Sequence, residues 1–194
     1  ESARHKIIGI TAETRPDCIT FRELKQFRSY GITRVQLGVQ HTNDEILKYV
    51  NRGHNNECSI KAIEMLKKHC FKVDIHIMPD MPGSNPSEDR LMMYKVLCTP
   101  EYSPDYLKIY PCLDVDYSEL RKWKMNGDWT PYSETNINEL ISVIMYAKMS
   151  SKYYIRFNRI QRDFPESKDD VLGYKSSTIK TNLRQLVQNE AKKQ

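Results

Sequence analysis

The chain alternates regularly between short apolar runs and stretches with helical periodicity, and this alternation most constrains its fold. The apolar runs are rich in β-branched residues, as strands buried in a parallel sheet are. Strands are predicted at residues 6–12, 34–39, 71–78, 106–110 and 153–160. Because parallel strands need long crossover connections, the helices between them predict an α/β fold with an open sheet or a barrel.

The stretches between the strands carry helix signals. Thr20 with Glu23 three residues later forms a capping box, and Gly31 ends the helix that it starts. In residues 135–148 the apolar side chains recur on one face, which is typical of a helix packed on a core. Further helices are predicted at residues 44–50, 57–70, 87–98, 117–125 and 178–192.

Composition narrows the class of protein. With 194 residues, of which 39% are hydrophobic, the chain can bury a core of ordinary size and is not a disordered protein. It shows no apolar run of membrane-spanning length and no signal peptide, so we expect a cytoplasmic protein that does not enter a membrane. The first residue, Glu1, is not Met, and we expect the chain to begin inside a longer protein.

The cysteines argue against a metal or disulfide framework. All five are widely scattered and none forms a CxxC pair. His54 and Cys58 have the i, i+4 spacing of two ligands on a helix, but no third ligand stands nearby in the sequence. We therefore predict no metal site within this sequence.

Basic residues gather toward the C-terminal end. From Lys148 onward there are eleven Lys or Arg against five Asp or Glu, in a chain whose net charge is +5. Such an excess suits a polyanionic partner, because a basic face collects phosphates. A solvated surface explains the same excess equally well.

Polar residues stand where the first three predicted strands end, and parallel α/β folds bind ligands at that edge. Glu13 and Arg15 follow the first strand, Gln40 and Arg52 follow the second, and His76 lies on the third. A carboxylate and a guanidinium placed there can hold a ribose diol and a ligand carboxylate. An ion pair between Glu13 and Arg15 and a core role for His76 are the alternatives.

The last two strands carry further candidates. Lys108 and Tyr110 share a face by alternation, and Lys108 is our catalytic candidate, because an unpaired buried ammonium is unfavourable. A Lys whose ammonium reaches solvent is the alternative. On the last strand, alternation places Arg156 and Arg162 on one face and Arg159 on the other. Arginines beside aromatic residues suit RNA, whose unstacked bases accept guanidinium and aromatic planes.

Six segments carry a resemblance to a known family. In chain order they read GITAETRPD, TRVQLGVQ, NRGH, KVDIHIMPDMPG, LKIYP and IRFNRIQRDFP, within residues 8–165. Their order and spacing resemble the radical S-adenosylmethionine (SAM) domain of the Elongator catalytic subunit, which modifies tRNA. The segments GVQ and NR are also similar to other radical-SAM enzymes, such as the oxygen-independent coproporphyrinogen dehydrogenases.

The resemblance implies a fold and an activity. The fold is a partial (β/α) barrel of the radical-SAM type, with parallel strands, outer helices and an incomplete N-terminal half. Residues 1–165 would belong to this barrel, and residues 166–194 would form a polar, basic helical tail or linker toward a missing acetyltransferase domain. In the family a 4Fe-4S cluster cleaves SAM to a 5′-deoxyadenosyl radical, which attacks acetyl-CoA. The acyl carbon is then joined to the wobble uridine (position 34) in the anticodon region of tRNA.

The resemblance also implies roles for residues and partners. By matching motif positions, the residues around SAM would be Glu13, Arg15, Gln40, Arg52 and His76. The reaction chamber would hold Lys108 and Tyr110, and the tRNA surface Arg156, Arg159 and Arg162. Implied protein partners are other Elongator subunits or a second copy of the chain.

The sequence departs from the family pattern in three places. The cysteines that bind the cluster are expected upstream of Glu1, and the acetyltransferase domain downstream of Gln194. After LKIYP the family has an apolar segment and a Gly-Thr pair, where this chain reads CLDVD at residues 112–116. Two alternatives to the enzyme therefore stay open: a truncated or degenerate tRNA-binding module without radical chemistry, and a radical-SAM enzyme with another substrate.

Overall fold

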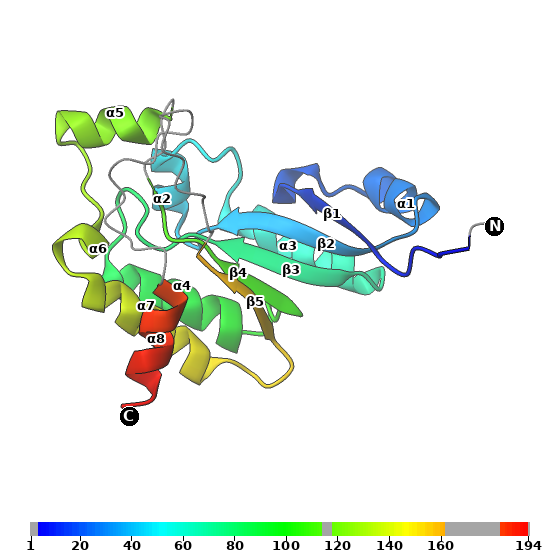
Figure 1. Cartoon of the computed structure of the whole chain (residues 1–194). Helices are drawn as coiled ribbons and strands as arrows, with labels where there is room; N and C mark the ends of the chain where they lie inside the picture. Colours follow the sequence, from blue (N-terminus) through cyan, green and yellow to red (C-terminus); the bar gives the residue numbers. More distant parts are fainter. Residues whose placement is uncertain (1–3, 114–117, 162–182, 194) are drawn as a thin grey trace.

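A computed structural model describes residues 4–113, 118–161 and 183–193 (Figure 1). Its centre is a five-stranded parallel sheet whose strands lie in sequence order and which does not close into a barrel. The strands are β1 (Ile10–Thr14), β2 (Ile32–Gln40), β3 (Lys72–Ile77), β4 (Tyr106–Ile109) and β5 (Arg156–Ile160). The α/β class and the parallel order predicted from the sequence are confirmed.

Helices between consecutive strands cover the apolar face of the sheet. They are α1 (Phe21–Ser29), α3 (Asn56–Lys68), α4 (Pro86–Cys98) and α7 (Ile137–Ser150), and their buried residues form one core with those of the strands. The last helix, α8 (Leu183–Ala191), packs on α7 and buries Leu183 and Val187 in the same core. Figure 1 shows α4, α7 and α8 together below the sheet.

Shorter elements lie near the C-terminal ends of the strands. A 3-10 helix, η1 (Pro16–Cys18), directly follows β1. The others are α2 (Asp44–Tyr49), α5 (Glu119–Asn126) and α6 (Tyr132–Thr135), on the left in Figure 1. Among the described residues, no helix combines the length and the apolar character needed to cross a bilayer.

The predicted helix signals are confirmed by local geometry. Thr20 Oγ1 accepts a hydrogen bond from the Glu23 N–H over 3.2 Å, and Gly31, with φ of +75°, follows the end of α1. Asn136 caps α7 by accepting from the Asn138 N–H over 3.1 Å. The boundary predicted at residue 165 lies outside the described residues and stays a prediction.

The first strand differs from the prediction. It begins at Ile10, not at residue 6, and the side chains of Ile7 and Ile8 are 79% and 101% exposed. Pairing with β2 starts at Ile10, and the side chains of β1 alternate between half-buried and exposed. The predicted strand at 6–12 was therefore wrong in its bounds and its burial, because apolar composition does not reveal where pairing begins.

The sheet has an apolar face and a polar face, since successive side chains of a strand point to opposite sides. The polar residues form rows across the strands, because the register places polar residues of neighbouring strands opposite each other. The aligned residues are Glu13 with Gln36, Gln36 with Asp74, His76 with Lys108, and Lys108 with Arg159.

A bulge in β5 changes which residues share this polar face. The pairing joins Tyr106 to Arg156 and Lys108 to Arg159, and it skips Asn158. Both arginines therefore align with polar-face residues, and the prediction that they lie on opposite faces is wrong. Strict alternation fails here because a bulge inserts one extra residue. The third arginine, Arg162, lies outside the described residues.

A buried carboxylate network ties the loops at the C-terminal edge together. Asp80, after β3, and Asp89, on α4, are 1% and 0% exposed. Asp80 accepts hydrogen bonds from the backbone N–H groups of Tyr132 and Ser133 over 2.7 and 3.2 Å, and its own N–H donates to Asp89 over 2.7 Å. Burial raises the pKa of Asp80 to about 6, because the charged carboxylate loses its hydration.

Replacing Asp80 with Asn tests this burial through the pH dependence of stability. The folded protein keeps the Asp80 proton up to about pH 6, whereas the unfolded chain releases it near the ordinary value of 3.8. The unfolded state therefore binds fewer protons in this window, and the Asp80 contribution to wild-type stability falls as pH rises. In urea unfolding, the difference between wild type and Asp80→Asn should shrink by up to about 3 kcal/mol across the window.

Glu64→Gln is the matched control on the surface. Glu64 is exposed, and its hydrogen bond with Lys68 lowers its pKa, so its contribution grows as pH rises. A wild-type to Asp80→Asn difference that stays constant, or that grows with pH, contradicts the assignment.

Candidate functional site

The residues predicted to bind a ligand come together around Gly38 on β2. Gly38 lies opposite His76 in the register, and Glu13 Oε1 lies 3.6 Å from His76 Nδ1. Arg52, in the loop after α2, donates from Nη2 to the Gly38 carbonyl oxygen over 3.0 Å. Side chains from three strands and one loop thus meet at the C-terminal edge of the sheet.

Gly38 leaves the space that the neighbouring side chains occupy. A Cβ atom at this position would lie 2.6 Å from Arg52 Nη2 and 3.0 Å from Gln40 Nε2. Any larger residue would therefore displace both groups. Gln40 ends β2 in the left-handed region, with φ of +69°, a conformation that a non-glycine residue keeps only when its surroundings hold it. The hydrogen bond from the Met78 N–H to the Gln40 carbonyl, 2.7 Å long, helps to hold it.

Three of these side chains hold buried polar atoms that have no hydrogen-bond partner among the described residues. The atoms are Gln40 Oε1, Arg52 Nε and His76 Nε2. Buried polar atoms are nearly always hydrogen-bonded in folded proteins, so a group of open donors and acceptors indicates a ligand site. Burial lowers the pKa of Arg52, and Arg15 lowers it further, yet a guanidinium stays charged at neutral pH.

His76 is neutral at pH 7. Burial, and then the charge of Lys108, lowers its pKa to about 4. Glu13 lies within reach of its ring, but the Glu13 side chain is 66% exposed, and water weakens its attraction for a proton on His76. The ring therefore offers a neutral hydrogen-bonding nitrogen to a ligand.

Arg15 pairs with Asp17 and not with Glu13. Its Nε donates to Asp17 Oδ1 over 2.9 Å, and its Nη2 contacts the other carboxylate oxygen. The guanidinium also lies over Gly53, whose missing Cβ would be 3.3 Å from Arg15 Nη2. Gly53 has φ of +82°, so the loop that carries Arg52 needs glycine for its backbone as well. The alternative Glu13–Arg15 ion pair is thus replaced by a pair within the segment after β1.

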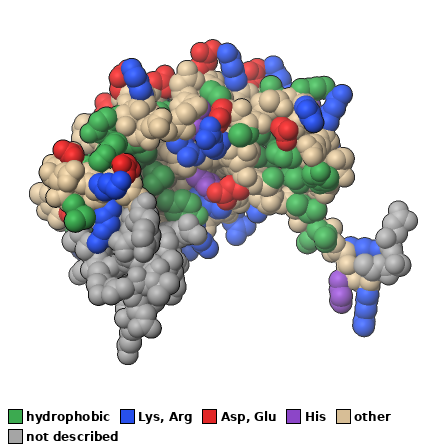
Figure 2. Space-filling view, turned by 90° about the horizontal axis from the view of Figure 1, so that it is seen from above, with side chains coloured by type: hydrophobic (Ala, Val, Ile, Leu, Met, Phe, Trp, Pro, Cys, Tyr) green, Lys and Arg blue, Asp and Glu red, His purple; other side chains and the backbone are tan. Residues whose placement is uncertain are grey.

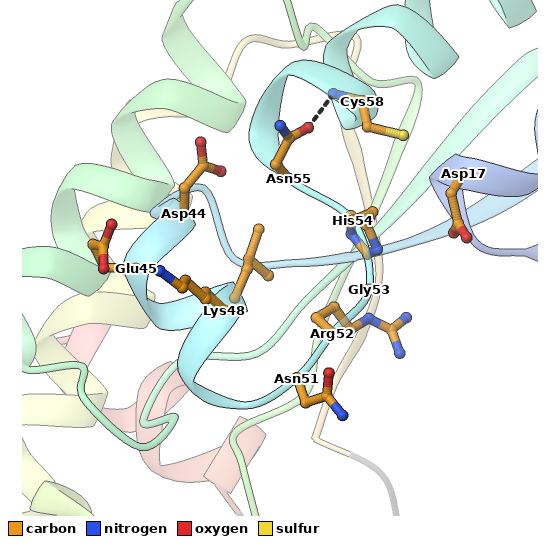
Figure 3. A pocket seen from close by; sticks show the side chains of 11 residues that line it. Asp17, Asp44, Glu45, Lys48, Asn51, Arg52, Gly53, His54, Asn55 and Cys58 are labelled. Atoms are coloured by element: carbon orange, nitrogen blue, oxygen red, sulfur yellow. Dashed lines mark hydrogen bonds between the residues drawn. The ribbon is translucent and has the colours of Figure 1, made fainter.

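A cavity of about 630 Å³ lies between η1, α2 and the start of α3 (Figure 3). Of the residues predicted to bind a ligand, Arg52 lines it, whereas Glu13, Arg15, Gln40 and His76 do not. Figure 3 shows Arg52, His54 and Asp17 close together, with the N-terminus of α3 next to them. The His54 ring lies 3.3 Å from the Val39 carbonyl through Nε2, and burial lowers its pKa. No cluster of three or more potential metal-ligating side chains exists among the described residues.

Lys108 lies across the polar face of the sheet. From β4 its Nζ reaches past β3 and donates to Gln36 Oε1 on β2 over 2.7 Å. Beside it, fully buried Asp74 accepts from Asn158 Nδ2 over 2.8 Å. Asp74 Oδ1 has no partner within the described residues, and burial raises the pKa of this carboxyl. The Lys108 side chain is half-buried, and its ammonium is paired with Gln36 on the sheet face.

Tyr110 stands at the same face, just beyond β4. Its ring meets the His76 ring edge-on, with centroids 5.6 Å apart. Burial raises the pKa of Tyr110, and Arg159, which hydrogen-bonds to it, opposes that effect. Arg156 and Arg159 are both exposed on β5. Seen from above, Figure 2 shows acidic, basic and histidine side chains close together near the middle of the surface.

Sequence reasoning missed several residues of this region. Asp17 and Asn55 line the cavity, and Gln36, Asp74 and Asn158 complete the polar face. Period-two spacing from His76 on the same strand contains the signal for Asp74. Gln36 and Asn158 become meaningful only when the strand register is known.

Known protein families and relatives match most of this chain. The profile of the Radical SAM superfamily matches residues 1–94, and that of the Radical_SAM C-terminal domain matches residues 104–193. The tRNA uridine(34) acetyltransferase of Methanocaldococcus infernus is 43% identical over 165 residues, covering 85% of this chain and 30% of that protein. The protein of the same name from Dehalococcoides mccartyi is 35% identical, covering 100% of this chain and 41% of that protein.

Relatives in eukaryotes and solved structures extend the likeness. Human Elongator complex protein 3 is 33% identical, covering 85% of this chain and 30% of that protein. The structure of archaeal Methanocaldococcus infernus Elp3 with an N-terminal deletion superposes with a TM-score of 0.89 at 40% identity, covering 99% of this chain and 43% of that chain. Coproporphyrinogen III oxidase (HemN) from Escherichia coli shares the fold, with a TM-score of 0.57 at 21% identity, over 73% of this chain and 32% of that chain. The chain spans less than half the length of these curated relatives.

The neutral state of His76 is testable by NMR. In a titration followed at the His76 Cε1–H group, the midpoint should lie at about 4. Lys108→Met should raise this midpoint, because a nearby positive charge is removed, and it should leave it below the ordinary 6.5, because burial remains. Lys67→Met, on the exposed side of α3, is the control and should leave it unchanged. A wild-type midpoint near 6.5 contradicts the burial of this ring.

Proposed function

Since the chain belongs to the radical SAM superfamily, and within it to the group of the tRNA uridine(34) acetyltransferases and Elongator complex protein 3, we propose that it is the SAM-binding part of a tRNA-modifying enzyme. The full-length protein would use SAM and acetyl-CoA to carboxymethylate the wobble uridine of tRNA in the cytoplasm. Other Elongator subunits or a second copy of the chain would be its protein partners.

The unpartnered buried atoms around Gly38 carry this proposal. SAM has a carboxylate, which needs a cation, and an amino group, which needs hydrogen-bond acceptors. Its two ribose hydroxyls need a carboxylate. Arg52 supplies the cation, Gln40 Oε1 an acceptor, and Glu13 a carboxylate at the mouth of the site. Arg15 stands next to Arg52 over Gly53 and adds positive charge, while His76 Nε2 offers a neutral contact. The residues present therefore fit SAM.

The described residues do not fit the cluster. The cysteines among them are separated in the sequence, and no group of three metal-ligating side chains forms. A 4Fe-4S cluster needs several thiolates, so its ligands would come from another part of the full-length protein. Bound next to such a cluster, SAM supplies the radical chemistry of this superfamily.

The chain's own residues would bind and orient the reactants. Lys108 Nζ, held by Gln36, presents a fixed positive charge on the polar face, and such a charge stabilises a substrate oxygen that becomes negative. Tyr110, held between His76 and Arg159, presents a hydroxyl at the same face. We assign both to the chamber in which acetyl-CoA reacts.

The tRNA would lie along β5. Arg156 and Arg159 are exposed on this edge strand, and the bulge at Asn158 aligns both with the polar face. Guanidinium groups on this edge strand can contact phosphates and leave the polar face of the sheet accessible. Arg162 belongs to the same proposal by its place in the sequence.

SAM binding to the full-length protein tests the ligand site. Gly38→Ala should weaken binding by about tenfold or more, because the added Cβ displaces Arg52 and Gln40 from their positions. Arg52→Met should weaken it by a similar factor, because the cation for the carboxylate is removed. Equilibrium dialysis with radiolabelled SAM measures both.

Gly9→Ala is the matched control, since a Cβ at Gly9 meets nothing within 4 Å. Unchanged affinity in both site variants would refute the SAM assignment. With the cluster reconstituted anaerobically, formation of 5′-deoxyadenosine in the presence of acetyl-CoA and tRNA separates the enzyme from a tRNA-binding module, which would form none.

Electrophoretic shifts with tRNA test the RNA surface. Changing Arg156, Arg159 and Arg162 to Ala should weaken binding, and it should reduce the slope of log affinity against log salt by about one for each phosphate that is no longer neutralised. Arg22→Ala, exposed on α1, is the control and should change neither quantity. If the triple variant keeps the wild-type affinity and the wild-type slope, tRNA does not bind at these arginines.

A further inference from the structure

Asp89 is a buried carboxylate outside the ligand site that accepts four hydrogen bonds. Its Oδ1 accepts from Ser84 Oγ over 2.6 Å and from His41 Nε2 over 3.2 Å. Its Oδ2 accepts from the Asp80 N–H over 2.7 Å and from the Tyr132 hydroxyl over 2.6 Å. A carboxylate can accept about four such bonds, so every lone-pair position is used. The first turn of α4, where it sits, adds a favourable dipole.

The donors come from three separate segments of the chain. His41 directly follows β2, Ser84 and Asp80 belong to the loop after β3, and Tyr132 belongs to α6. A single side chain on α4 therefore fixes the ends of two neighbouring strands relative to each other. The length and the apolar residues of these loops would not by themselves fix the two strand ends.

The link through His41 leads directly to Gln40. His41 Nδ1 accepts from the Asn43 N–H over 3.0 Å, so the ring proton is on Nε2 and is donated to Asp89. The peptide between His41 and Gln40 is thereby held from one side, and the Met78 N–H holds the Gln40 carbonyl from the other. Gln40 keeps its left-handed backbone under this double restraint, with its side-chain oxygen open toward the ligand site.

We propose that Asp89 is a positioning residue for the ligand site, which acts through His41 to fix the backbone and the amide of Gln40. The proposal rests on the proposed function in taking SAM as the ligand that Gln40 contacts. It separates two roles of one carboxylate. The Oδ1 side orients the site through His41, and the Tyr132 hydroxyl on the Oδ2 side holds α6 against the body of the fold.

Four variants of the full-length protein test this division, each measured for thermal stability and for SAM affinity by equilibrium dialysis. Asp89→Asn and His41→Phe should each weaken SAM binding by about tenfold, because Gln40 is no longer held. The double variant should be no weaker than either single variant, since both remove the same link. Tyr132→Phe should lower the melting temperature and leave SAM affinity unchanged. In turnover, His41→Phe should raise the KM for SAM and leave kcat within about twofold.

The outcomes distinguish the positioning role of Asp89 from the assignment of SAM as the ligand. If neither Gln40→Ala nor Arg52→Met weakens SAM binding, the SAM assignment itself fails. If Arg52→Met weakens binding and Gln40→Ala does not, Gln40 does not contact SAM and the positioning proposal fails. If Gln40→Ala weakens binding and His41→Phe does not, Asp89 has a structural role only. Tyr132→Phe weakening SAM binding as much as His41→Phe leads to the same conclusion, because a general loosening then explains both. If Asp89→Asn does not fold, the comparison of SAM affinity between His41→Phe and Tyr132→Phe tests the proposal without it.

Discussion

Successive side chains of the parallel strands alternate between the two faces of the sheet, and this alternation sets where both the core and the polar site lie. Because paired residues share a face, the register that buries Val35, Val73 and Leu107 on one side brings polar residues into rows on the other. One set of side chains then drives folding by leaving water, while the opposite set is available for chemistry. Neither face can be changed by one register step without exchanging the two roles.

The polar face holds both hydrogen-bonded and unpartnered buried groups. Lys108 is held by Gln36, and Asn158 holds one oxygen of Asp74, whose other oxygen has no partner among the described residues. Near the ends of the strands, Gln40 and Arg52 keep buried atoms without a partner in the part of the chain that the structure describes. Leaving buried polar atoms open is unfavourable for the folded chain alone. The network around Asp89 lies next to Gln40 and holds the loops that a ligand would otherwise have to order.

Burial acts on two titratable groups of this edge in opposite directions. Asp80 keeps its proton when buried, so its contribution to stability falls with rising pH, and His76 stays unprotonated when buried, so its contribution rises. Both changes fall between about pH 4 and 6.5. In the dependence of wild-type stability on pH, the two effects therefore partly cancel, and only single-site variants separate them.

Local sequence patterns were enough to predict the order of strands and helices, the cap at Thr20, and the strand-end segments that carry Glu13, Gln40, Arg52 and His76. These depend on local periodicity and on residues close together in the chain. The tertiary structure set the start of β1 at Ile10 and the bulge that aligns Arg156 with Arg159. It alone also showed the four hydrogen bonds of Asp89. The reason is that register and burial arise between segments tens of residues apart, and no local pattern records which partner a buried polar atom finds.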